Sequence, residues 1–284
     1  MRRRRWLWVL GAILVLGWVV SAPVRRWAHW GGFLQRFESV EARPGTPEIF
    51  AGIRGRRWAR AEPEPLEPAV VLVHGVHPEG GEEPRMARLA TIFADEGFVV
   101  HVPHLPTLAA FEPDPEVVPK LADYFEAARL RHGCVGAVGI SVGGGVALRA
   151  LEDTPVTGVL TVGAHADLVA LRDHHRETGG TRYARRVMEA AGDVPPVVLS
   201  ALSPRRGPRG PVWVLHGEGD PLVPADQADR LCELIGCARR VRTPWLGHTE
   251  VDGESPIPVL TLLDEAVAAM KTSCAQVRLR AASL

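Results

Sequence analysis

A serine stands between two glycines in the segment Gly139-Ile140-Ser141-Val142-Gly143, directly after an apolar run at residues 134–138. In a sharp strand-to-helix turn such a serine has strained backbone, and small neighbours avoid clashes. Its hydroxyl then projects above a sheet and could attack a carbonyl carbon, provided that a base takes its proton. Because glycine and serine are common, an ordinary glycine-rich turn could give the same five residues. Ser141 therefore needs partners before it indicates catalysis.

Two later segments offer those partners, the first after a valine-rich run of strand length and the second after the next expected strand. Residues 216–224, HGEGDPLVP, place Asp220 in a tight turn, and residues 245–249, WLGHT, contain His248. A histidine can act as the base for a serine, and a carboxylate can orient that histidine. The order serine, acid, histidine is that of one large class of hydrolases. The three residues together indicate acyl transfer far more strongly than the serine turn alone.

Strands must bring these residues together, and the sequence predicts a mostly parallel α/β sheet with helices on both faces. Continuous valine-rich runs such as residues 69–73 and 98–102 alternate with segments of helical periodicity, as at Met86, Leu89 and Phe93. Between residues 163 and 210 the alternation lapses. We expect a short helical lid insertion there, and an extended crossover helix with a surface loop is the alternative.

The motifs resemble those of the α/β-hydrolase superfamily, in particular the dienelactone-hydrolase-like and prolyl-peptidase-like esterases. The resemblance runs from about Pro68 to Met270 and includes VLVHG at residues 71–75, GISVGG at 139–144, HGEGDPLVP and the Gly-His pair before the last helix. It implies the α/β-hydrolase fold, with Ser141 as nucleophile, His248 as general base and then acid, and Asp220 as the residue that orients His248. Glu218 and Asp167 remain alternative acids.

An acyl-transfer site also needs donors for the negative charge that develops on the carbonyl oxygen. We expect two backbone amides to supply them. Val142 follows the nucleophile and opens a helix, and the loop at residues 74–78 supplies the second donor, which by the resemblance is Val76. The glycine-rich HGGG sequence of lipases is absent from this loop.

Residues 1–30 differ from the rest of the chain. Four arginines at residues 2–5 precede an uncharged run at residues 6–24, whose 19 positions would span about 28 Å as a helix, close to the thickness of a bilayer core. We expect an uncleaved, single-pass signal anchor with the hydrolase domain in the periplasm or outside the cell. A cleaved signal peptide is the alternative, because Val20-Ser21-Ala22 resembles a cleavage site, although Pro23 disfavours cutting there.

These features divide the chain into a membrane segment (1–30), a tether with edge strands (31–68), a hydrolase domain (69–271, with the insertion at 163–210) and a loose tail (272–284). A strand is expected near residues 48–53. Cys232 and Cys237 are close enough to form a disulfide, and free buried thiols are the alternative. The net charge is zero, from 33 basic and 33 acidic residues, so nothing indicates a nucleic-acid partner.

Several histidines invite a metal hypothesis, notably His101 and His104, with more at residues 165–175. H-x-x-H at a strand end broken by proline does not have the i, i+4 helical spacing that aligns two imidazoles, so we expect no metal and no cofactor. His77 and His104 could line the substrate pocket. The sequence predicts a membrane-anchored serine hydrolase of small-molecule or lipid-like carboxylic esters. A peptidase, amidase or acyltransferase of the same fold, or a non-catalytic binding module, is the alternative.

Overall fold

The computed structural model describes residues 41–60, 67–182, 184–185, 187, 194–244, 246–248 and 257–282. The chain divides into two compact units, Met1–Val40 and Glu41–Leu284. The first unit, with the expected membrane segment, lies outside the described residues. Among the described helices, none is long and apolar enough to cross a membrane.

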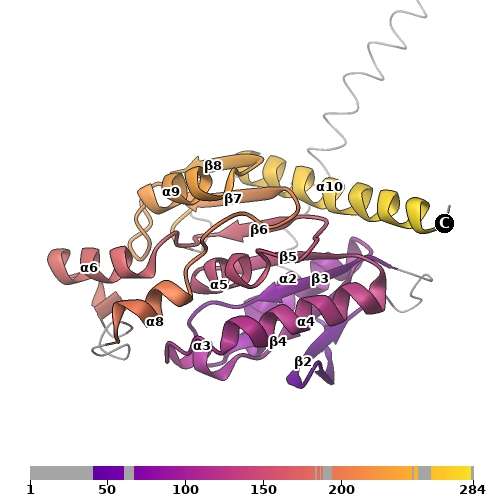
Figure 1. Cartoon of the computed structure of the whole chain (residues 1–284), viewed down its shortest axis with the longest axis horizontal. Helices are drawn as coiled ribbons and strands as arrows, with labels where there is room; N and C mark the ends of the chain where they lie inside the picture. The colour runs from indigo at the N-terminus through magenta and orange to yellow at the C-terminus, as the bar shows by residue number, and fades with distance from the viewer. Residues whose placement is uncertain are drawn as a thin grey trace, which may run out of the picture. The chain divides into compact units, whose positions relative to one another are not determined.

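The described part of the second unit is built on an eight-stranded sheet of order β1-β2-β4-β3-β5-β6-β7-β8 (Figure 1). Strands β3 to β8 are parallel, whereas β1 and β2 form an antiparallel hairpin that joins the edge of β4. The strands are β1 (Thr46–Phe50), β2 (Ile53–Trp58), β3 (Ala69–Val73), β4 (Val99–Pro103), β5 (Val135–Ile140), β6 (Val159–Val162), β7 (Val212–Gly217) and β8 (Arg239–Thr243). The mostly parallel sheet predicted from the valine-rich runs is confirmed.

Helices cover both faces of this sheet, as its apolar strands require. They are η1 (Gly80–Glu82), α2 (Pro84–Asp95), α3 (Pro106–Ala110), α4 (Val117–His132), α5 (Val142–Ala150), α6 (Leu168–Thr178), α8 (Pro196–Ala201), α9 (Asp226–Ile235) and α10 (Ile257–Ala282). In β5, Val135 and Ala137 belong to the core shared with α4 and α5. Gly136, between them, faces Met270 of α10. In Figure 1, α4 and α5 cover the face of the sheet turned toward the viewer.

Two local predictions differ from the structure. The strand expected near residues 48–53 is a hairpin, because the chain turns at Ala51 and Gly52, which both have positive φ. The loose tail expected after Lys271 is helical up to Ala282. Cys274 explains the second difference, because its side chain is buried and disulfide-bonded to Cys134 at the start of β5.

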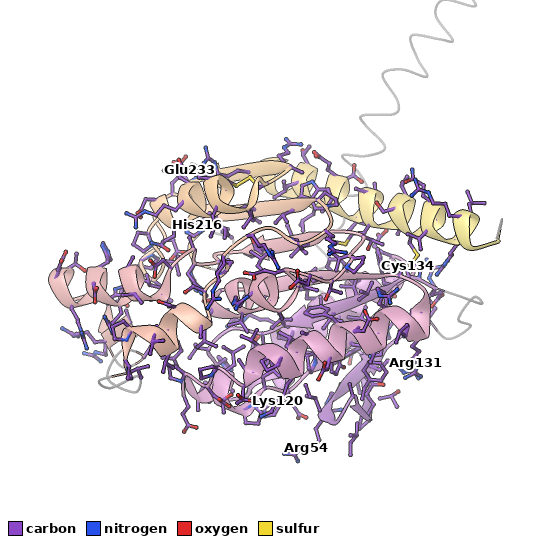
Figure 2. The ribbon with its side chains drawn as sticks, in the orientation of Figure 1. Arg54, Lys120, Arg131, Cys134, His216 and Glu233 are labelled. Carbon is purple, nitrogen blue, oxygen red and sulfur yellow. A yellow bond between two sulfur atoms is a disulfide. The ribbon has the colours of Figure 1, made fainter. Side chains whose placement is uncertain are left out.

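All four cysteines are paired. Besides Cys134–Cys274, a disulfide joins Cys232 near the end of α9 to Cys237 before β8, so the disulfide rather than the free thiols is found there. Figure 2 labels Cys134 beside the start of β5. The first bridge fastens the last helix to the strand that leads to Ser141.

The insertion between β6 and β7 contributes α6 and α8, and hydrogen bonds within the insertion and to α9 hold it in place. The amide of Leu168 donates to Ser203 Oγ, and Arg172 donates to the Val194 carbonyl. Gln227 of α9 accepts from the amides of residues 166 and 167. No lid over Ser141 is shown by the described residues of the insertion, so the lid stays a prediction.

Candidate active site

Ser141 has the strained backbone that its turn predicts, with φ 55° and ψ −129°. It follows β5 directly and caps the N-terminus of α5. The residues two positions before and after it must be glycine. A Cβ at Gly139 would lie 2.4 Å from the Cα of Gly144, and one at Gly143 would lie 2.1 Å from the carbonyl oxygen of His74. The turn therefore exists only because the sequence removes these side chains.

His248 lies between Ser141 and Asp220, although the three residues come from distant parts of the chain. Its Nε2 is 2.7 Å from Ser141 Oγ, and its Nδ1 is 2.7 Å from Asp220 Oδ2. Because an ionised carboxylate only accepts hydrogen bonds, Nδ1 carries the proton and donates to Asp220. Nε2 is then free to accept the hydroxyl proton of Ser141. This is the tautomer that a histidine needs to act as base toward a serine.

Asp220 is buried and held by the backbone that follows it. Its Oδ1 accepts the amide N–H groups of Leu222 at 2.8 Å and Val223 at 2.9 Å, while Oδ2 faces His248. The two alternative acids lie elsewhere. Asp167 caps the N-terminus of α6 by accepting from the amides of residues 169 and 170, and Glu218 is exposed. Only Asp220, of these three carboxylates, contacts the imidazole.

The loop after β3 passes directly against the serine. A Cβ at Gly75 would lie 3.0 Å from Ser141 Cβ. His74 fixes this loop, because its Nδ1–H donates to the Gly75 carbonyl at 2.7 Å and its Nε2 accepts the amide of Leu105 at 3.1 Å. Burial lowers the pKa of His74 to about 4, so the ring stays neutral and can make both bonds at neutral pH.

The two predicted oxyanion donors belong to segments that adjoin the serine: Val142 follows it in the chain, and Val76 lies in the loop that contacts it through Gly75. Val142 is the first residue of α5, where amide N–H groups have no carbonyl one turn earlier in the helix. Val76 follows the Gly75 contact to Ser141. The N-terminus of α5 adds a favourable dipole for an anion at this place.

Sequence reasoning missed two parts of the site. Gly163, at the end of β6, has φ +60° and packs against the imidazole of His248. His175 and His216 are buried beside the turn that carries Asp220. The signal for His175 was present, since Leu168, Leu171 and His175 repeat on one face of a helix.

Of the two histidines at the end of β4, His101 has partners other than a metal. His101 is fully buried and bonded to Glu48 at 2.6 Å and to His132 at 3.0 Å, while the rings of His104 and His74 are 6.0 Å apart. Within the described residues, no group of three or more histidine, cysteine or acidic side chains could hold a metal ion.

Comparisons with known proteins agree with this architecture. No protein-family model and no curated protein matches the sequence. Among solved structures, a hormone-sensitive lipase from a metagenome library is similar over 89% of this chain and 89% of its own, with a TM-score of 0.58 and 16% identity. A thermophilic esterase from Thermogutta terrifontis matches 81% of this chain and 96% of its own, with a TM-score of 0.51 and 16% identity.

An acylaminoacyl peptidase from Pyrococcus horikoshii is also similar, over 80% of this chain, with a TM-score of 0.53 and 14% identity. This chain spans 40% of that peptidase's length. The chain has the α/β-hydrolase fold, as the resemblance in its motifs implies. Esterases, lipases and peptidases all occur among the similar structures, so the fold leaves the scissile bond open.

Proposed function

We propose that this protein is a serine hydrolase that cleaves carboxylic esters through an acyl-enzyme intermediate. One observation carries the proposal: His248 makes a 2.7 Å contact to Ser141 Oγ on one side and to the Asp220 carboxylate on the other. The imidazole thus lies between a strained serine and a buried carboxylate. The same arrangement is what activates a serine hydroxyl.

In the proposed reaction, Ser141 Oγ attacks the ester carbonyl carbon while His248 Nε2 takes the hydroxyl proton. The amides of Val76 and Val142 donate to the oxygen that becomes negatively charged. When the tetrahedral intermediate collapses, the bond to the alkoxy oxygen breaks and His248 returns the proton to the departing alcohol. His248 then deprotonates a water molecule, which attacks the acyl group on Ser141 and releases the carboxylic acid.

Throughout both steps, Asp220 keeps His248 in the reactive tautomer and stabilises the imidazolium that forms. The carboxylate needs no proton for this role. Two backbone amides donate to its Oδ1 and hold the carboxylate in this orientation. No metal or cofactor takes part in the proposed reaction.

The test is hydrolysis of p-nitrophenyl esters with acyl chains from acetate to palmitate, beside a set of peptide p-nitroanilides. We expect ester turnover that disappears in Ser141→Ala. Turnover of the anilides without any of the esters would replace the esterase by a peptidase or amidase. Ester turnover that survives in Ser141→Ala would refute the proposed nucleophile.

We further propose that residues 1–30 anchor the protein to a membrane, with the hydrolase domain in the periplasm or outside the cell. The arginine cluster before a long uncharged run supports the anchor. The pairing of all four cysteines supports an oxidising compartment. An alkaline phosphatase fusion at the C-terminus should be active, and an inactive fusion that is stably expressed would contradict this orientation.

A further inference from the structure

The turn that carries Asp220 is held from outside by two buried histidines. His216 of β7 donates from Nε2 to the carbonyl of Val223 at 2.8 Å, and His175 of α6 donates from Nε2 to the carbonyl of Leu222 at 2.6 Å. His216 is labelled in Figure 2. Leu222 and Val223 are also the two residues whose amides bind Asp220 Oδ1. Each of these residues is therefore fixed at its N–H by the carboxylate and at its carbonyl by an imidazole.

Burying these two imidazoles costs free energy, because each buries a polar atom that has no hydrogen-bond partner in the part of the chain that the structure describes. His216 is fully buried and His175 is 5% exposed, and the Nδ1 atom of each has no hydrogen-bond partner among the described residues. Because a carbonyl only accepts, both rings carry a proton on Nε2, and each Nδ1 remains a buried polar atom without a partner in the described ranges. A leucine would fill similar volume without that cost. A histidine can donate from Nε2 to a carbonyl of the turn, whereas a leucine cannot. These two hydrogen bonds are therefore the reason for a histidine at each position.

Asp220 depends on this turn for its aim. If the peptide units at residues 222–223 rotate, Oδ1 loses its two donors and the carboxylate can swing away from His248 Nδ1. His216 also lies close to the carboxylate, because its Nε2 is 3.6 Å from Asp220 Oδ2, the oxygen that accepts from His248. Burial lowers the pKa of His216, so this contact is between a neutral ring and a carboxylate and does not compete with His248 as an ion pair.

We propose that His175 and His216 are positioning residues that aim Asp220 at His248 by clamping the carbonyls of Leu222 and Val223. The inference rests on the proposed function, since it assumes that the orientation of Asp220 toward His248 matters for catalysis. It also gives the insertion at residues 163–210 a part in catalysis, because His175 lies on α6. His175 thus links α6 to the imidazole of His248 through the turn and Asp220.

The test replaces each histidine by glutamine and by asparagine. The side-chain amides of these two residues reach different distances from the backbone. In His216→Gln and His175→Gln the side-chain amide can lie near the position of Nε2 and keep the donor. In His216→Asn and His175→Asn the shorter amide lies near Nδ1 and the donor is lost, and His216→Leu removes it entirely. We expect the Gln variants to stay within about threefold of the wild-type kcat. The Asn and Leu variants should lose about 10- to 100-fold in kcat with KM unchanged, the effect of a misplacement near 1 Å.

A merely structural role is separated by repeating the same substitutions in Asp220→Asn. If the histidines act through Asp220, they change kcat by less than about twofold in that background. His101→Leu is the matched control, because His101 is equally buried in β4 and bonded to Glu48 away from the turn. It should destabilise the fold to a similar extent while the folded protein keeps its kcat.

The inference is overturned if the Asn and Leu variants keep the wild-type kcat, if Gln loses as much as Asn, or if the losses add to that of Asp220→Asn. The proposed function fails separately, when Asp220→Asn itself keeps the wild-type kcat.

Discussion

Gly163 packs directly against His248. A Cβ at Gly163 would lie 2.8 Å from the carbonyl oxygen of His248 and 3.1 Å from its ring. The end of β6 thus forms a wall for the imidazole, and β6 pairs with the strand that leads to Ser141. This contact and the hydrogen bond to Asp220 restrict the position of the imidazole ring.

Gly163→Ala should therefore misplace the base. We expect kcat to fall about 100-fold, as for a shift of about 1 Å at a reacting group, with a smaller change in KM. The residue also has φ +60°, so alanine there is strained whatever it contacts. Gly52→Ala is the matched control, because Gly52 has φ +77° but a Cβ added there would meet no atom within 4 Å. Equal losses of kcat in the two variants would show that strain rather than contact with His248 is responsible.

Asp220→Asn should lower kcat by about 10⁴-fold with little change in the fold. Asparagine can still accept the amides of Leu222 and Val223, but its NH₂ group facing Nδ1 would favour the wrong tautomer of His248. The comparison is Asp167→Asn, which keeps a good helix cap and lies on α6 away from the imidazole. Steady-state kinetics on one ester measures kcat for both variants. A larger loss of kcat in Asp167→Asn than in Asp220→Asn would mean that Asp167, not Asp220, is the residue that orients His248.

Stability should fall as the pH drops from about 6.5 to about 4. Burial lowers the pKa of His74 and His165 to about 4, so each stays neutral in the folded protein while the unfolded chain takes up a proton near pH 6.5. Protonation then favours unfolding throughout this window, by about 1.4 kcal/mol per pH unit for each histidine. Above pH 6.5 neither state is protonated there, and the effect disappears.

Denaturant unfolding at several pH values measures this dependence. His165→Leu should flatten it by about 1.4 kcal/mol per pH unit. His174→Leu, at an exposed position, should leave it unchanged. A wild-type stability that is constant between pH 6.5 and pH 4 would contradict the burial of these rings.

The two disulfides should contribute unequally. Cys134–Cys274 closes a loop with a sequence separation of 140, whereas Cys232–Cys237 closes one of 5. Loop-closure entropy assigns about 5 kcal/mol to the first and about 2 kcal/mol to the second. Urea unfolding of Cys274→Ser and Cys237→Ser should therefore show the larger loss in Cys274→Ser, and the reverse order would contradict this pairing.

The sequence could predict the sheet and the meeting of Ser141, Asp220 and His248 because of one geometric rule. Each of these residues follows a parallel strand, and the carboxyl ends of parallel strands lie at the same edge of a sheet. The need for glycine on both sides of Ser141 could also be predicted from the sequence, since a tight strand-to-helix turn has no room for side chains there.

Other features depend on contacts that sequence patterns do not encode. Nothing near Cys134 indicates Cys274, because their pairing follows only from the packing of α10 behind β5. Asp167 and Asp220 both follow strands, and only the path of the next few residues makes one a helix cap and the other a partner of His248. Likewise, the role of His216 requires the turn at Val223 to fold back onto β7.

The central claim is that Ser141 is an activated nucleophile, and labelling with a fluorophosphonate probe tests it most directly. We expect the folded wild-type protein to take up one probe per chain, located by mass spectrometry on Ser141, and Ser141→Ala to take up none. Folded wild-type protein that does not react, or that reacts at another serine, would contradict the account.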